Sequence, residues 1–312
     1  MRTCISRHPG PVVLVGLIML VLLAGRLLAR DAIQGVHANA GSLVRNIDEF
    51  TRIDWTNGVL YARAEVRLPR IVFDSSNPEF GQPGTATSIT GARSQARFEA
   101  RELAALRLMN ALTGLQLDSR FTVREKMNQD RVLREQMGYV SDHFVVRSRH
   151  TGEGYVSVEL ALPFLGDNGL YALLSRSYYN TRPVPEVGPV DVVDEVTGIV
   201  IDMREFPDFQ PSLEPRIFSD QGRMIYGPEM VTRTCAMRRG MGIYYTSDEM
   251  ARRDRRVGLR PYYVYAAGLV GPDRTDLYLD AHDVERLLGH ASGRQALHYC
   301  AVVFVMPAAG NR

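Results

Sequence analysis

Three carboxylates and one arginine stand close together in the second half of the chain. Asp202, Glu205 and Asp208 surround Arg204, just beyond an apolar stretch that is typical of a buried strand. Paired carboxylates can perform acid–base chemistry, or hold a cation or a sugar. We expect instead a solvated loop whose charges neutralise one another. The alternative, a ligand-binding or hydrolytic module at Asp202–Asp208, requires a cleft and an acid with a strongly shifted pKa.

The histidines do not have the spacing of a metal site. His282, His290 and His298 recur at eight-residue steps, whereas a helical metal pair needs a step of three or four residues on one element. His143 and His150 flank a predicted hairpin strand, where solvent exposure explains them. We therefore expect no metal and no cofactor.

Nucleophilic catalysis is also disfavoured. The sequence has no Gly-x-Ser-x-Gly elbow. The nearly continuous apolar stretch Leu297–Met306 predicts a central strand, on which Cys300 shares a face with His298. A thiol buried in such a strand has a raised pKa and low reactivity. We expect no catalytic residues, so the chain is not predicted to be an enzyme.

A cluster of arginines follows a helix start. The capping box Thr246–Glu249 predicts a helix through Arg256. Arg252, Arg255 and Arg256 would share one face of it. We expect a solvated helix face, and a patch that binds an acidic protein surface or an anionic glycan is the alternative. Nucleic acid is excluded as a partner, because 37 basic and 35 acidic residues leave a net charge of only +2.

The elements that position these residues predict two small α+β domains. In the first, residues 31–180, a strand is followed by an alanine-rich helix, a more polar helix and a hairpin, which gives a β-α-(α)-β-β unit. Alanines at three- and four-residue steps predict close packing of the first helix on a sheet. The expected elements are a strand over Ile53–Leu68 with a turn at Asn57-Gly58, helices over Ser88–Leu117 and Arg120–Met137, and hairpin strands over Tyr139–Arg149 and Tyr155–Pro163.

A linker and a second domain follow. Pro183, Pro185 and Pro189 give residues 181–195 the composition of a linker. Residues 196–312 are predicted to form a second α+β domain, with a mixed sheet and two short helices.

The first thirty residues read as an export signal. Arg2 and Arg7 precede Val12–Gly25, an apolar run of about 14 residues, short of the roughly 20 that span a bilayer. A cleaved signal is expected, and retention as a membrane anchor is the alternative. Leu23-Ala24-Gly25 begins like a lipoprotein processing box, but Arg26 stands where the acylated cysteine is required, so no direct lipid anchor is expected.

Export also bears on the cysteines. Cys4 lies in the signal, which leaves Cys235 and Cys300. An oxidising compartment favours a disulfide between them, and two buried free thiols are the alternative.

Residues 50–175 resemble a bacterial outer-membrane lipoprotein family whose relatives include the flagellar proteins FlgP and FlgT. The resemblance lies in the Ala/Arg-rich helix that starts near Thr90, in the strand Gly154–Glu159 with its alternating valines, and in Pro163–Gly166. The second half is similar to a module that follows such domains in exported proteins, through the strand Thr197–Arg204 and the hairpin from Pro215 to Gly227.

The resemblance implies a non-enzymatic protein of the periplasm or the periplasmic face of the outer membrane. It would act in the assembly or stabilisation of a surface structure, and the flagellar relatives point to the flagellum. Its partners would be envelope or flagellar proteins, or further copies of the chain.

Overall fold

The computed structural model describes residues 41–174, 179–188 and 195–308. The expected signal segment, Arg26, Cys4 and the middle of the linker lie outside these residues. The elements of the described residues are of the α+β class, as the sequence predicts, and they cluster into one compact unit. Among the described residues, no helix is both long and apolar enough to cross a membrane.

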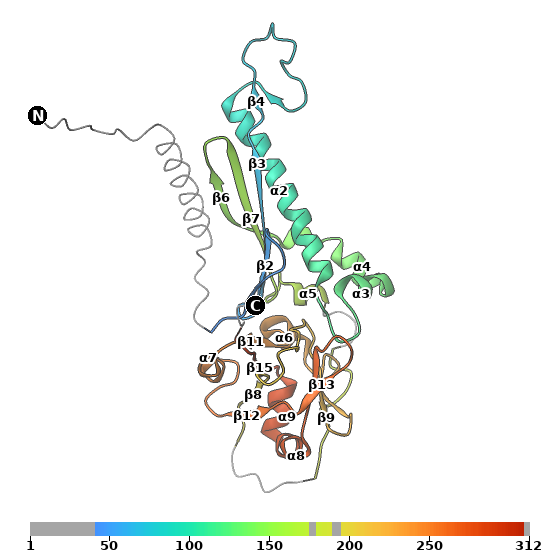
Figure 1. Ribbon diagram of the computed structural model, residues 1–312. Helices are drawn as coiled ribbons and strands as arrows, with labels where there is room; N and C mark the ends of the chain where they lie inside the picture. Colours follow the sequence, from blue (N-terminus) through green and yellow to red (C-terminus); the bar gives the residue numbers. More distant parts are fainter. Residues whose placement is uncertain (1–40, 175–178, 189–194, 309–312) are drawn as a thin grey trace, which may run out of the picture. The chain divides into compact units, whose positions relative to one another are not determined.

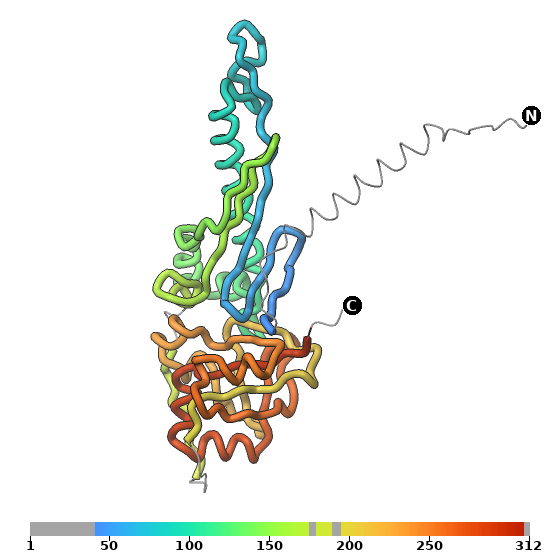
Figure 2. Tube along the Cα trace, turned by 90° about the vertical axis from the view of Figure 1, so that its left-hand side faces the viewer, coloured from blue at the N-terminus to red at the C-terminus, as the bar shows by residue number. Residues whose placement is uncertain are grey.

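The first half is built on an antiparallel sheet with strand order β1-β2-β3-β7-β6. Helix α2 runs beside β3 and the β6–β7 hairpin in both views (Figures 1 and 2). Alanines at four-residue steps, Ala92, Ala96, Ala100 and Ala104, are fully buried, which confirms the close packing of this helix on the sheet. The elements are β1 (Val44–Asn46), β2 (Thr51–Asp54), β3 (Val59–Arg67), α2 (Ile89–Gly114), β6 (Val145–Thr151) and β7 (Tyr155–Pro163).

The second predicted helix is two helices. Its expected range is divided at Asp130, whose side chain accepts a hydrogen bond from the Leu133 backbone N–H and caps the second helix. A short 3-10 helix follows, so β6 starts at Val145 and not at Tyr139, where the strand was expected. The elements of this region are α3 (Val123–Gln129), α4 (Arg131–Met137), η1 (Val140–His143) and α5 (Leu170–Leu174), while β4 (Arg70–Ile71) pairs with β5 (Thr85–Ala86) before α2.

The second half contains the expected mixed sheet, with strand order β10-β9-β14-β13. It also contains a fully parallel sheet with strand order β11-β15-β8-β12 and more helices than the two expected. The elements are β8 (Gly198–Asp202), β9 (Ile217–Ser219), β10 (Met224–Tyr226), α6 (Arg233–Arg239), β11 (Ile243–Tyr245), α7 (Asp248–Arg253), β12 (Pro261–Tyr265), β13 (Gly268–Val270), β14 (Asp276–Leu279), α8 (Ala281–Gly289), α9 (Ala291–His298) and β15 (Val302–Val305).

Both faces of the parallel sheet are covered. Ile199 and Phe304 face the main core, whereas Val200 and Val303 face a smaller apolar cluster that includes Ala251 of α7. A strand buried on both faces needs apolar residues at successive positions, which explains the unbroken apolar sequence of β8 and β15. Gly198 allows close packing here, since a Cβ atom would lie 2.2 Å from the Val257 Cα.

The expected strand over Leu297–Met306 is wrong in its first part. Residues 291–298 form α9, with His290 as its N-cap, and β15 begins only at Val302. Cys300 lies in the turn between them, with a φ of 53°. His298 and Cys300 therefore do not share a strand face. The later part is confirmed, because β15 lies between β11 and β8 in the sheet.

One apolar core extends through both halves, from Leu60 and Leu108 to Ile199 and Phe304. The described part of the expected linker is held against it. The Arg182 backbone N–H donates to the Glu229 carbonyl at 2.9 Å, and Val184 and Val187 pack on the core. The domain boundaries at 181 and 195 stay a prediction.

Candidate partner-binding site

The carboxyl end of the parallel sheet carries a cluster of charged and aromatic side chains. Asp202 is the last residue of β8 and is 4% exposed. Its Oδ2 accepts a hydrogen bond from the Tyr263 hydroxyl of β12 at 2.6 Å. Arg204 donates from Nε to both Asp202 oxygens at 3.0 Å and from Nη2 to Oδ2 at 2.5 Å. Because β8 and β12 are parallel neighbours, their last residues meet at one edge.

Both oxygens of the Asp202 carboxylate therefore already accept hydrogen bonds from neighbouring side chains. Burial would raise the pKa of Asp202, but hydrogen bonds from Arg204 and Tyr263 outweigh it, so the pKa lies below its ordinary value. Burial and the hydrogen bond to Asp202 raise the pKa of Tyr263 to about 12. Both carboxylate oxygens hold an arginine and a tyrosine in place, which is an arrangement for positioning rather than for proton transfer.

Arg252 of α7 approaches the same tyrosine from its face. The guanidinium carbon of Arg252 lies 3.8 Å from the centroid of the Tyr263 ring. The Arg204 Nη2 lies 3.2 Å from the hydroxyl of this tyrosine, so one ring has a guanidinium at its face and another at its edge. Tyr265, 61% exposed, packs edge-on against Tyr263 at 5.6 Å. We call Asp202, Arg204, Arg252 and Tyr263 the Tyr263 cluster.

One residue of the predicted arginine patch, Arg256, does not belong to an exposed patch. Helix α7 ends at Arg253, so Arg252, Arg255 and Arg256 do not share a helical face. Arg256 is only 7% exposed and points into the core, where its Nη1 lies 3.3 Å from the Val302 carbonyl oxygen. Arg252 and Arg255 are exposed and form no ion pair among the described residues.

The predicted acidic site is divided. Asp202 belongs to the Tyr263 cluster, whereas Asp208 is exposed and pairs with Arg274. Glu205 is exposed beside them. An open groove in the described residues is lined by residues around α4 and by none of these three acids.

The two cysteines are free thiols in the structure, which differs from the expected disulfide. Cys300 is buried and Cys235 is half-buried. Burial raises the pKa of the Cys300 thiol to about 12, and the nearby Cys235 adds to this effect. Among the residues that the structure describes, no three His, Cys, Asp or Glu side chains are grouped to hold a metal ion.

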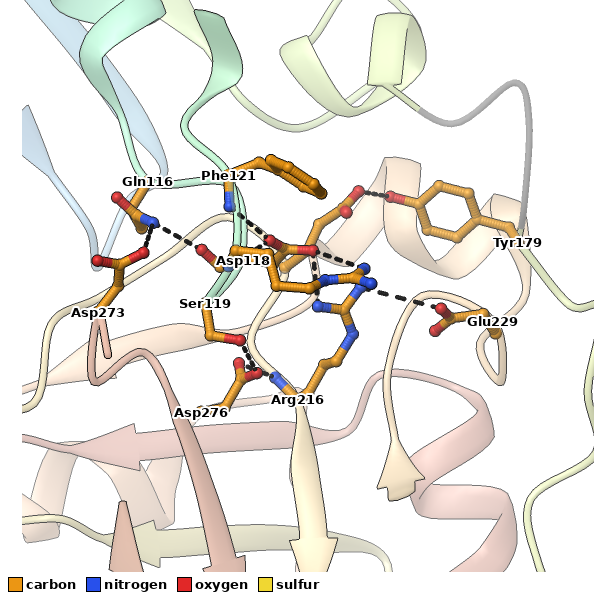
Figure 3. Close-up of polar contacts among 11 residues, drawn as sticks. Gln116, Asp118, Ser119, Phe121, Tyr179, Arg216, Glu229, Asp273 and Asp276 are labelled. Atoms are coloured by element: carbon orange, nitrogen blue, oxygen red, sulfur yellow. Dashed lines mark hydrogen bonds and ion pairs between the residues drawn. The ribbon is translucent and has the colours of Figure 1, made fainter. Parts of the chain in front are cut away.

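A second polar cluster, which the sequence reasoning missed, joins the turn after α2 to the second half (Figure 3). The Arg216 Nη1 donates to Asp118 Oδ2 at 2.6 Å, and both side chains are at least nine-tenths buried. The Ser119 hydroxyl and the Arg216 backbone N–H donate to the two oxygens of Asp276. Glu229 lies 3.9 Å from Arg216. We call these five residues the Asp118 network.

The pKa shifts in the Asp118 network follow from burial and charge. Burial works to raise the pKa of Asp118, but the Arg216 charge and hydrogen bonds lower it below its ordinary value. Burial raises the pKa of Asp276, against the opposing hydrogen bonds from Ser119 and Arg216. The sequence around Asp118 and around Arg216 gives no signal for this network, because the two residues pair over 98 positions and such a pairing has no local signature.

The comparisons with known proteins concern the second half. Residues 198–308 match the family model described as Treponema pallidum Tp0624, second domain. The match includes every member of the Tyr263 cluster and lies outside residues 50–175. It covers less than half of the chain. No curated protein matches the chain.

Proposed function

We propose that this chain is an exported cell-envelope protein that binds partner proteins during the assembly or stabilisation of a surface structure, without catalysing a reaction. The observation that carries the proposal is the Tyr263 cluster. It holds two guanidinium groups around the Tyr263 ring, near the carboxyl end of β8, and the exposed Tyr265 packs against that ring. Arginine and tyrosine are enriched where protein interfaces derive most of their binding energy.

The construction of the cluster supports a binding role. Arg204 is held by a buried carboxylate and Arg252 rests on a ring, so little side-chain entropy is lost when a partner binds. Arg252 and the neighbouring Arg255 have no ion pair among the described residues, which favours an acidic partner surface. The Asp118 network ties the turn after α2 to this second half through a buried ion pair.

Export and the flagellar association are the finer parts of the proposal. Export rests on the apolar run Val12–Gly25 behind two arginines. The flagellar association rests only on the resemblance of residues 50–175 to the lipoprotein family. Cleavage of the signal, placement at the outer membrane and self-association belong to the same proposal.

A ligand-binding or hydrolytic module is the second candidate. It is favoured by the position of Asp202 and Tyr263, because open parallel sheets bind ligands at the carboxyl ends of their strands. It is weakened because both oxygens of Asp202 already hold Arg204 and Tyr263.

Fractionation combined with crosslinking tests the proposal. Source cells are separated into cytoplasm, periplasm, membranes and purified flagellar basal bodies, and each fraction is blotted for the chain. We expect the protein in the envelope fractions, crosslinked to a defined partner that is lost in an Arg252→Glu variant and kept in an Arg253→Glu control. A cytoplasmic pool contradicts export. A soluble periplasmic pool without crosslinks favours the ligand-binding candidate, and absence from basal bodies removes the flagellar part.

A further inference from the structure

A groove opens on the first half, far along the sequence from the Tyr263 cluster. Helix α4, the turn at Tyr139, η1 and residues 167–173 surround it, and its volume is about 560 Å³. Binding pockets for organic ligands and short peptide segments commonly have volumes of about 300–1,000 Å³. We call it the α4 groove.

Half of the residues that line the α4 groove are apolar or aromatic, and the described part of the chain leaves them partly exposed. Val132 is 51% exposed and Tyr139 is 68% exposed, although both are large apolar or aromatic side chains. Ala172 and Leu173 of α5 line the other side. The Tyr139 side chain forms no hydrogen bond or ring contact with the described residues. Exposed apolar side chains gathered in one concave place are typical of an interaction site.

The carboxylates that line the α4 groove are not balanced by basic lysine or arginine side chains in the lining. Glu135 and Asp167 contribute carboxylates, and the residues that line the groove include no lysine or arginine. Arg131 pairs with Glu135 at 3.2 Å from outside the lining, but both side chains are well exposed, so this pair is weak and can be exchanged. His143 is engaged through Nδ1 with the Asn168 carbonyl oxygen at 2.9 Å.

We propose that the α4 groove binds a basic segment of a partner protein that carries apolar anchor residues. The apolar side chains of the segment would pack on Val132, Tyr139 and Leu173, while its lysines or arginines would pair with Glu135 and Asp167. Complementary charge on the rim selects the partner and its orientation, and apolar contact supplies affinity. This site is separate from the Tyr263 cluster, which favours a partner of the opposite charge.

Three labelled twelve-residue peptides test the proposal on the full chain by fluorescence anisotropy. The first alternates arginine with leucine, the second alternates glutamate with leucine, and the third alternates arginine with serine. We expect the first peptide to bind at least tenfold more tightly than the other two. The advantage should disappear in the double variant Glu135→Lys, Asp167→Lys and fall in Tyr139→Ser.

A matched control carries lysine at two exposed acids away from the groove, Glu65 and Glu153, and should bind like the unmodified chain. The proposal is overturned if the arginine–leucine peptide binds no better than the other two. It is also overturned if the groove variants and the control variant lose affinity equally, because binding would then follow net charge rather than the groove. Circular dichroism confirms that each variant is folded.

Discussion

Arg252 lies over the face of Tyr263, with its guanidinium carbon 3.8 Å from the ring centroid, although the two residues are eleven positions apart in the sequence. The contact joins the helix after β11 to the middle of β12. It brings together two features that the sequence suggests separately, the arginine patch and the charged residues that follow β8. Arg204 reaches the hydroxyl of the same tyrosine, so a single ring organises both guanidinium groups.

The first prediction concerns this contact. Arg252→Glu should abolish recovery of the crosslinked partner, because it reverses a charge at the centre of the cluster. It should lower the free energy of unfolding by no more than about 1 kcal/mol, the magnitude of an exposed cation–π contact. Urea unfolding and crosslinking on the same preparations measure both effects. Equal loss of the partner in Arg253→Glu would show that general charge, not this contact, is responsible.

The buried pair in the Asp118 network should be costly to break. Arg216→Met removes the buried cation of Asp118 and leaves only the exposed Arg120 beside this carboxylate. We expect it to lower the free energy of unfolding by about 3–5 kcal/mol. The double variant Asp118→Leu, Arg216→Met should recover most of this loss, since the buried carboxylate is removed together with its buried cation. Urea unfolding measures the difference. The exposed pair offers a control, because Arg274→Ala should change stability by about 1 kcal/mol or less.

The two aspartates of the Asp118 network should give opposite pH dependences. The pKa of Asp118 is lowered in the folded state, so its contribution is present above the unfolded value of about 3.9 and is lost as the pH falls through the folded-state pKa. The pKa of Asp276 is raised, so its contribution is complete below about 3.9 and is lost as the pH rises through the folded-state pKa.

Asn substitutions should separate these effects. Asp118→Asn should weaken the loss of stability in acid, and Asp276→Asn should weaken the loss as the pH rises above about 4. Urea midpoints measured at several pH values for each variant provide the check. If the urea midpoints of both variants depend on pH in the same way as those of the unmodified protein, these two residues are not the source of the pH dependence.

The alanines of α2 should not tolerate enlargement. Ala100 is fully buried between the helix and the sheet, so Ala100→Leu should lower the free energy of unfolding by about 1–3 kcal/mol through overpacking. Phe98, 66% exposed on the same helix, is the matched control, and Phe98→Ala should change stability by about 0.5 kcal/mol or less. Thermal or urea unfolding compares the two. Similar values for both would mean that the alanine spacing does not set the helix–sheet distance.

The thiols should differ in reactivity. In the native protein, an alkylating reagent should modify the half-buried Cys235 and leave Cys300 intact until the chain is unfolded, because Cys300 is buried and its pKa is about 12. Peptide mass mapping without reductant reads the result. A linked peptide containing both residues would instead support the disulfide that the sequence analysis favours.

Local patterns predict much of the first half. Four-residue alanine spacing defines α2, and a Gly-containing turn between alternating apolar residues defines the end of β6 and the start of β7. The second half is harder to predict, because a short apolar run is compatible with either a helix or a buried strand. This ambiguity explains why Leu297 belongs to α9 while Val302 belongs to β15.

The site was only partly predictable for a similar reason. The capping box defines where α7 begins, but not that it ends at Arg253, and the end decides whether Arg256 faces solvent or the core. Tyr263 enters the cluster through the pairing of β12 with β8, more than 60 residues apart. Such a pairing is set by the whole sheet and has no signature in a local window.

The position of β15 in the parallel sheet also constrains the order in which this half can form. β15 separates β11 from β8, yet it follows both along the chain, about 100 residues after β8. During synthesis from the amino terminus, β8 and β11 therefore emerge without the strand that each must pair with. They stay unpaired on that side until residues 302–305 emerge, so the parallel sheet assembles late. The export that we propose would gain time from such an arrangement, because an exported chain crosses the membrane before it folds.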